Sequence, residues 1–418
     1  MNHPKIFLNG VTYAWPRHPV VVVCIDGGDP AYLEQGMRDG IIPNIARFMK
    51  NGFRAVAVGT VPSFTCPNNM SLITGAPPSV HGISGNYYLD VATGAAVVMT
   101  GPELLRSRTI LAQFADAGAK VVSITAKDKL RKQLGKDLTF AHGDISFSAE
   151  KADQCTLAEN GIENVLNLVG MPLPDMYSME LSLFVLEAGI RLLERDRPDL
   201  MFLSLTDYIQ HKHAPGDPVA NEFYRRIDAA FGRLADAGAV VALTADHGMN
   251  DKSTADGKPN VIFLQDILDR EFGAGDTRVI CPITDAFVKH HGALGGFVRV
   301  WCLGGKATPS AIIALLKGMP GIAEALSKEE VCRRFDLPAD REGDVAVLAE
   351  PHVVIGAAAA EHDLSTLGDF RLRSHGAVSE ARVPFILSHP LTAVYRERAA
   401  AAPLQSYEIF DYAINGVV

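Results

Sequence analysis

The stretch VVVVCIDGGDP, Val20–Pro30, opens with six apolar residues and stops sharply at Asp26. A continuous apolar run rich in β-branched residues is typical of a strand buried on both faces, as in a parallel sheet. The same pattern predicts strands at 120–125, 200–205 and 239–244, and helices at about 67–74, 104–117, 177–195 and 217–237. Alternating strands and helices predict an α/β fold, a mostly parallel central sheet flanked by helices on both faces.

The pattern of apolar residues changes near residue 271. Short apolar segments predict strands at 278–281, 297–303, 345–348 and 353–355. Thr308-Pro309 and Ser327–Glu330 have the residue types that begin helices. We therefore expect a small α+β cap domain at 271–368, inserted into a catalytic core formed by 1–270 and 369–418.

The composition is that of a globular chain without a basic face. Hydrophobic residues make up 48%, charged residues 21%, and the formal net charge is −9. Nucleic acids and anionic membranes are bound through basic surfaces, so we expect neither as a partner. The segment before Val20 lacks the apolar run of a secretory signal, and no later stretch is long enough to span a bilayer. The six cysteines contain no CxxC pair, so we expect reduced thiols in a cytoplasmic protein.

Carboxylates and imidazoles gather at the expected carboxyl ends of these strands, where ligands bind in such sheets. The candidates are Asp26, Asp207, His211, Asp246, His247 and His375. Asp207 and His211 are four residues apart, so one helical turn presents both on the same face. Singly, such an aspartate is often a helix cap and such a histidine is often structural. Together the six suit zinc, with three ligands for each of two ions that clamp a displacement at phosphorus.

A candidate nucleophile lies in Pro62–Gly75, PSFTCPNNMSLITG. Pro67 suits the first position of a helix, which would make Thr65 or Cys66 the cap. A helix start favours an anionic oxygen or a phosphoryl group, and zinc makes a threonine hydroxyl nucleophilic near neutral pH. The alternatives are that Thr65 is only a cap, or that Cys66 is the nucleophile.

Further candidates lie near these motifs. Lys127 and Lys129 follow the strand at 120–125, so they are expected to face the same edge of the sheet unless they are a solvated surface pair. Asn86, in Gly85–Tyr88, has a residue type that is common in turns, and a role in the site is implied for it only by the resemblance given below. In the inserted unit, His290 and His291 either reach over the site or lie in a solvated loop.

These motifs resemble the alkaline phosphatase superfamily, and more narrowly its nucleotide pyrophosphatase/phosphodiesterase-like branch. The resemblance rests on Asp26, Thr65-Cys66-Pro67-Asn68, Asp207-x3-His211, Thr244–Gly248, Ser374–Gly376, Thr74–Pro78 and Val80–Ile83. It implies an alkaline phosphatase-like fold. It also implies two zinc ions, one on Asp207, His211 and His375 and one on Asp26, Thr65, Asp246 and His247.

Within this branch, the lysine pair resembles the enzymes that cleave the carbon–phosphorus bond of phosphonoacetate. That resemblance implies hydrolysis to acetate and phosphate through a phosphothreonine at Thr65. Lys127 and Lys129 would hold the carboxylate of this small phosphonate. The remaining substrate contacts would be Thr65, Asn86, His211 and His375.

Other functions remain open from the sequence. A two-zinc phosphodiesterase or phosphomonoesterase is the main alternative, and a nucleotide would need an aromatic platform such as Phe64, Tyr87 or Tyr88. A binding protein that had lost catalysis would lack Thr65 or a ligand, and none is missing. Manganese or iron would accept similar ligands. A homodimer is compatible with the sequence, which does not fix the oligomeric state.

Overall fold

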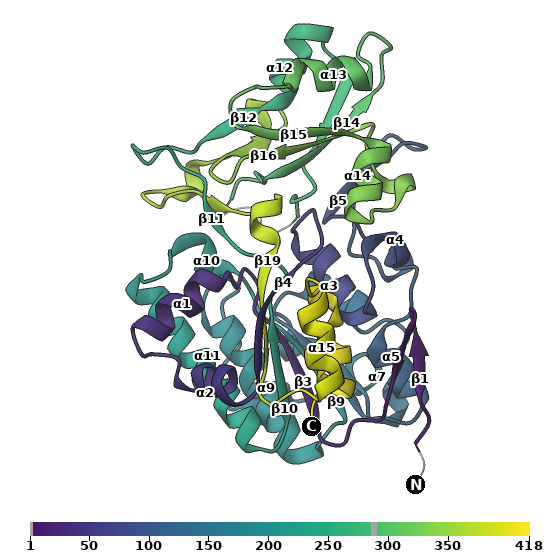
Figure 1. Cartoon of the computed structure of the whole chain (residues 1–418), viewed down its shortest axis with the longest axis vertical. Helices are drawn as coiled ribbons and strands as arrows, with labels where there is room; N and C mark the ends of the chain where they lie inside the picture. The colour runs from purple at the N-terminus through teal and green to yellow at the C-terminus, as the bar shows by residue number, and fades with distance from the viewer. Residues whose placement is uncertain (1–2, 286–290) are drawn as a thin grey trace.

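The computed structural model describes residues 3–285 and 291–418, and a seven-stranded sheet forms the centre of its larger part (Figure 1). In sheet order the strands are β4 (Phe53–Val58), β19 (Arg382–Leu387), β10 (Val240–Thr244), β3 (Val20–Cys24), β9 (Leu200–Ser204), β7 (Val121–Thr125) and β8 (Ile145–Ser148). The five strands from β10 to β8 are parallel, and β19 is antiparallel to β10 and β4. The predicted mostly parallel sheet is confirmed.

Helices cover both faces of this sheet. Packed on one face are α1 (Pro30–Arg38), α2 (Pro43–Asn51), α9 (Glu180–Asp196) and α11 (Pro218–Asp236). On the other are α3 (Thr65–Thr74), α5 (Ile110–Asp116), α6 (Asp128–Leu134) and α16 (Ile409–Asp411). Within β3, Val21 and Val23 join the first apolar core, whereas Val20 and Val22 join the second. Burial on both faces explains why the apolar run in the sequence is continuous.

A smaller antiparallel sheet lies at one end of the molecule (Figure 1). Its strands, in order, are β13 (Thr277–Ile280), β14 (Phe297–Cys302), β16 (Val345–Ala349) and β15 (Ile322–Ser327). It carries α12 (Leu264–Phe272), α13 (Pro309–Leu316) and α14 (Lys328–Phe335). Thr308 and Ser327 accept hydrogen bonds at the starts of α13 and α14, as their sequence predicts. α12 runs across residue 270, where the sequence predicts the boundary between core and cap. That boundary stays a prediction.

Short strand pairs and short helices complete the fold. The strand pairs are β1 (Ile6–Leu8) with β2 (Val11–Tyr13), β5 (Tyr87–Asp90) with β6 (Ala95–Val98), β11 (Asn250–Asp251) with β18 (Arg373–Ser374), and β12 (Val261–Phe263) with β17 (Val354–Gly356). The remaining helices are α4 (Pro78–His81), α7 (Leu157–Asn160), α8 (Val165–Val169), α10 (Tyr208–Lys212) and α15 (Ala393–Ala401). β11 and β18 pair where the chain leaves the large sheet and where it returns, which brings residues 250 and 374 together.

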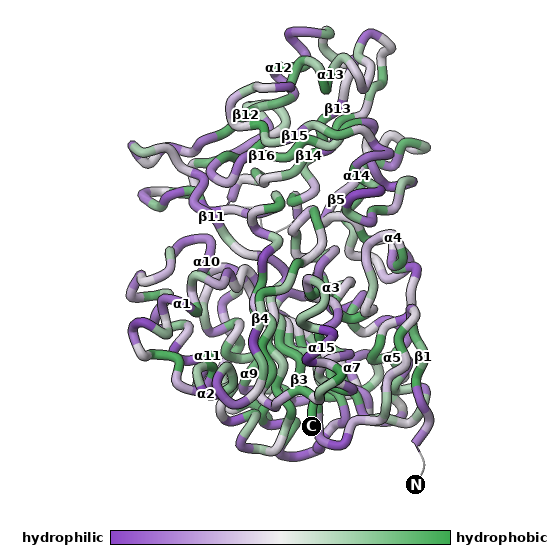
Figure 2. The backbone as a smooth tube through the Cα atoms, in the orientation of Figure 1, coloured by the Kyte–Doolittle hydropathy of each residue, from purple (hydrophilic) through white to green (hydrophobic). Residues whose placement is uncertain are grey.

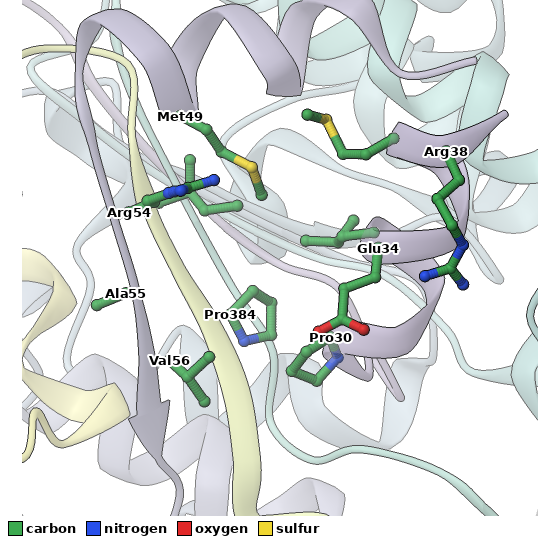
Figure 3. A pocket seen from close by; sticks show the side chains of 11 residues that line it. Pro30, Glu34, Arg38, Met49, Arg54, Ala55, Val56 and Pro384 are labelled. Carbon is green, nitrogen blue, oxygen red and sulfur yellow. The ribbon is translucent and has the colours of Figure 1, made fainter. Parts of the chain in front are cut away.

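Apolar residues concentrate along the central strands of both sheets (Figure 2). Among the described residues, no helix is long and apolar enough to cross a membrane. A surface hollow of about 540 Å³ lies beside α1, α2 and the strands β4 and β19 (Figure 3). Its walls are mainly apolar, and none of the predicted site residues lines it. The candidate site is therefore elsewhere.

Candidate active site

The carboxyl ends of three adjacent strands bring the acidic site residues together. β10, β3 and β9 are neighbours in the sheet, and they lead into Asp246, Asp26 and Asp207 respectively. All six predicted ligands are at most 2% exposed. Such dense burial of carboxylates and imidazoles is costly unless charge is balanced within the site.

The six residues form two clusters of three. Asp207, His211 and His375 form one, Asp26, Asp246 and His247 form the other, and within each cluster the candidate ligand atoms lie within 4.8 Å of one another. The two clusters adjoin, because the rings of His247 and His375 stack with their centroids 3.5 Å apart. The structure thus brings together the same two groups that the sequence predicts for two metal ions.

Each histidine is oriented in the same way. Nδ1 of His211 lies 2.8 Å from the carbonyl oxygen of Arg373. Nδ1 of His247 lies 2.9 Å from the carbonyl oxygen of Gly248, and Nδ1 of His375 lies 2.8 Å from that of Ser63. A ring that donates from Nδ1 to a carbonyl presents Nε2, the pattern expected of metal-binding histidines. Nε2 of each ring accordingly lies near a carboxylate: Asp207 for His211 and His375, and Asp26 for His247.

The carboxylates suit a cation. Among the described residues, neither oxygen of the buried Asp26 side chain accepts a hydrogen bond. Asp246 accepts from the backbone of Gly27 and His247 and from Nδ2 of Asn69, yet burial and then Asp26 raise its pKa. A buried carboxyl group whose charge is disfavoured by burial and by a second carboxylate fits a site for a divalent metal ion.

Two glycines allow the loops of the site to approach closely. Gly376 has a φ of +123°, and a Cβ there would lie 2.4 Å from the ring of Phe64. A Cβ at Gly248 would lie 2.4 Å from an oxygen of Asp29. Gly248 does not have a positive φ, so glycine is needed there because of this close approach to Asp29 and not because of its backbone conformation.

Thr65 lies beside the second cluster, with its hydroxyl oxygen 3.5 Å from Nε2 of His247 and only 3% of the residue exposed. The expectation that Thr65 or Cys66 caps the helix is wrong. α3 begins at Thr65 and its N-cap is Phe64, so Pro67 is the third helical residue. Proline fits there because the first helical N–H groups have no partner within the helix. The hydroxyl of Thr65 is thereby directed to the site instead of to the helix backbone.

Cys66 is fully buried, and burial raises the pKa of its thiol to about 12. It is therefore protonated at neutral pH, unlike a reactive cysteine. Its backbone N–H donates to Oδ1 of Asn86, over 3.0 Å. Asn86 thus caps the start of α3 from outside the helix.

Lys127 lies among the predicted metal ligands. Its Nζ is 2.8 Å from Oδ1 of Asp207 and 3.7 Å from Oδ2 of Asp26. Burial alone would lower the pKa of the ammonium, but Asp207 and Asp26 raise it. The alternative of a solvated surface pair is wrong, because the side chains of Lys127 and Lys129 are 6% and 9% exposed.

Lys129 forms a buried ion pair with Asp285, a residue that the sequence analysis missed. Burial would raise the pKa of Asp285, but Lys129 and Lys127 lower it. No local pattern marks this aspartate, which follows β13 in the inserted unit. Its side chain reaches the site only because the two sheets are brought together.

His291 is buried at 3% exposure, and its ring stacks on that of His211 with the centroids 5.2 Å apart. The interpretation in which it reaches over the site is confirmed, and the solvated loop is wrong for this residue. His290 lies outside the described residues.

Comparison with known proteins gives the family. Residues 20–376 match the family model of type I phosphodiesterases/nucleotide pyrophosphatases. Two crystal structures of phosphonoacetate hydrolase from Sinorhizobium meliloti 1021, in complex with phosphonoacetate or phosphonoformate, are each 45% identical to this chain, with a TM-score of 0.95 over 100% of both chains. Murine ectonucleotide pyrophosphatase/phosphodiesterase 5 shares the fold, at 18% identity and a TM-score of 0.62 over 94% of this chain and 93% of that one.

A segment of 30 residues is 67% identical to phosphonoacetate hydrolase from Penicillium oxalicum, covering 7% of this chain and 42% of that protein. The chain matches less than half the length of two curated relatives, 44% of one and 42% of the other. The family model nevertheless spans nearly the whole chain, including every candidate ligand. The protein is therefore a hydrolase that belongs to the type I phosphodiesterase/nucleotide pyrophosphatase family, within the alkaline phosphatase superfamily.

Proposed function

We propose that this enzyme hydrolyses the carbon–phosphorus bond of phosphonoacetate to acetate and phosphate, with two zinc ions and Thr65 as nucleophile. The observation that carries the proposal is the placement of two buried lysines, Lys127 and Lys129, beside the paired clusters. A simple ester has no carboxylate for buried ammonium groups to bind. The relative from Sinorhizobium meliloti, which was crystallised with phosphonoacetate, supports the same substrate.

Asp207, His211 and His375 would hold one ion, and the cluster at Asp26 together with Thr65 would hold the other. Three imidazoles and three carboxylates form a donor set that suits zinc, and manganese or iron would accept similar ligands. When bound, the ions lower the pKa of the Thr65 hydroxyl and stabilise the charge on the phosphonate oxygens. The ring stacking of His247 on His375 supports two neighbouring ions rather than one.

The reaction follows from the positions of the residues. Oγ1 of Thr65 attacks phosphorus, the carbon–phosphorus bond breaks, and the electron pair remains on C2 of the leaving acetate. The ammonium groups of Lys127 and Lys129 hold the carboxylate into which this charge delocalises. In this step Thr65 loses a proton and C2 gains one, which gives acetate. Water then attacks the phosphothreonine, which releases phosphate and restores the Thr65 hydroxyl.

The alternative, a phosphodiesterase or phosphomonoesterase, has less support because the three aromatic residues have other contacts. Phe64 is fully buried against His375 and Gly376. Tyr87 packs with Leu89, Ile280 and Trp301 in a cluster away from the ligands. The ring of Tyr88 lies under the guanidinium of Arg341. Each of these rings therefore already packs against other residues.

The direct test is phosphate release by the zinc-loaded protein from phosphonoacetate, an aryl phosphodiester and an aryl phosphomonoester. We expect a kcat/KM for phosphonoacetate well above that for either ester, and loss of that activity with a chelator. Ester turnover without any phosphonoacetate turnover would overturn the substrate assignment and favour the phosphodiesterase alternative.

A further inference from the structure

Asn86 forms three hydrogen bonds with the segment that follows β13 in the smaller sheet. Its backbone N–H donates to the carbonyl of Pro282 over 2.8 Å. Its side-chain Nδ2 donates to the carbonyl of Ile283 over 3.2 Å and to Oδ2 of Asp285 over 3.4 Å. The contact with Asp285 is long for a hydrogen bond, so this N–H can be shared with a second acceptor. The segment after β13 therefore helps to position Asn86 near Thr65, together with the N–H groups of Cys66 and Met99, which donate to Asn86.

The same oxygen of Asp285 also receives the ammonium of Lys129. The exposed fractions of the two side chains are 9% for Lys129 and 6% for Asp285, so little solvent screens this ion pair. Lys127 is nearby but contacts different carboxylates, those of Asp207 and Asp26. Each lysine therefore has a different nearest carboxylate, although the charge of Asp285 also raises the pKa of Lys127.

We propose that Asp285 is a positioning residue for phosphonoacetate, which fixes the distance between the group that binds the carboxylate and the group that binds the phosphonate. This inference rests on the proposed function, in which Lys129 contacts the carboxylate and Asn86 contacts a phosphonate oxygen. Asp285 joins these two groups through one carboxylate oxygen. It acts through them and does not itself react.

Lys129 needs a residue that positions it because the lysine side chain is long. A lysine carries a point charge on a flexible four-carbon stem, so its position depends on the partners that it contacts. Asn86 lies in the loop between α4 and β5, whereas Lys129 is on α6, so their separation depends on contacts between these two segments. A shared buried acceptor sets it, as outer hydrogen bonds orient the groups that touch a ligand. Phosphonoacetate has one carbon between its phosphonate and its carboxylate, so a fixed separation selects for that length.

The test compares Asp285→Asn and Asp285→Ala with the wild type on phosphonoacetate and on an aryl phosphate ester. Loss of a charged hydrogen-bond partner predicts a rise in KM for phosphonoacetate on the order of tenfold to a hundredfold, with a smaller change in kcat. We expect the ester kcat/KM to change much less, and the Asn variant to retain more affinity than the Ala variant. The matched control is Asp340→Ala, which removes an exposed ion pair with Arg106 and should change neither substrate.

Two outcomes would overturn the inference. A fall in KM for phosphonoacetate would mean that Asp285 competes with the substrate for Lys129. Equal losses on both substrates would mean a purely structural role. The Lys129→Ala background gives a second readout: if Asp285 acts through Lys129, most of the effect of Asp285→Ala disappears there, whereas independent effects would add.

The positioning role of Asp285 can be tested even if the protein does not hydrolyse phosphonoacetate. If the wild type releases no phosphate from phosphonoacetate, inhibition of ester hydrolysis by phosphonoacetate still reports the binding of a carboxylate and a phosphonate at this spacing. A rise in the inhibition constant in Asp285→Ala, on the order of tenfold, would then support the positioning role without any carbon–phosphorus cleavage. An unchanged inhibition constant would overturn it, whatever the substrate.

Discussion

Nζ of Lys127 lies 2.8 Å from Oδ1 of Asp207, so a residue expected to bind substrate contacts a residue expected to bind metal. This contact joins the lysine that we propose binds the substrate carboxylate to the first of the two candidate ligand clusters. A substrate carboxylate at Lys127 would therefore lie directly beside that cluster. Charge that develops on the leaving acetate would then be stabilised where it forms.

Replacing Lys127 with Ala should reduce kcat/KM for phosphonoacetate by about two to three orders of magnitude, as expected when a preorganised charged group is lost. The loss on an aryl phosphate ester should be much smaller, because an ester leaving group has no carboxylate. Steady-state kinetics on both substrates provide the measurement. Lys132→Ala is the matched control, since Lys132 is exposed on α6, the helix that follows Lys127. Similar losses on both substrates would assign Lys127 a structural role.

Thr65 and Cys66 can be separated by substitution. Thr65→Ala should abolish turnover of every substrate, whereas Thr65→Ser should retain part of it, because the hydroxyl oxygen remains. Cys66→Ala should keep most of the activity, since burial raises the pKa of the Cys66 thiol to about 12 and it stays protonated at neutral pH. Trapping of labelled phosphate on the protein by acid quench measures the intermediate. Phosphate on Cys66, or full activity in Thr65→Ala, would exclude Thr65 as the nucleophile.

The two clusters predict two ions per chain, with one lost when a ligand of one cluster is replaced. Asp26→Asn and His211→Ala should each lower the bound metal from two equivalents to about one, measured by elemental analysis. Loading with zinc should also raise the unfolding temperature, because binding to the native state alone stabilises it. Asn250→Ala, outside both clusters, serves as the control. A single ion in the wild type would contradict the two-metal assignment.

The strand ends that carry the ligands could be predicted because burial on both faces leaves a continuous apolar run. β3 and β10 end within one residue of the expected positions. The antiparallel β19 was not predicted, and Pro384 inside it explains why, since proline removes a donor from the ladder and argues against a strand. The site was predictable where its residues follow strands in the sequence. Asp285 was not, because its place depends on packing between two sheets that no local pattern encodes.

The inserted unit also holds the Asn86 loop through a buried ion pair. Nη2 of Arg299 donates to the carbonyl of Ser84 over 2.8 Å, and the guanidinium pairs with Glu342, with both side chains 0% exposed. Breaking such a pair leaves an uncompensated buried charge, so Arg299→Met should lower the free energy of unfolding by about 3–5 kcal/mol. Replacing both partners with apolar residues should recover much of that loss.

Urea unfolding of the metal-loaded protein measures these changes, and Arg334→Met gives the comparison. Arg334 pairs with Glu324 at the surface, where the side chains are 42% and 36% exposed, so its loss should cost about 1 kcal/mol or less. Because Arg299 supports the loop that carries Asn86, its variant should also raise KM for phosphonoacetate in the fraction that folds. Equal destabilisation by the Arg299 and Arg334 variants would mean that the buried pair contributes no more than a surface one.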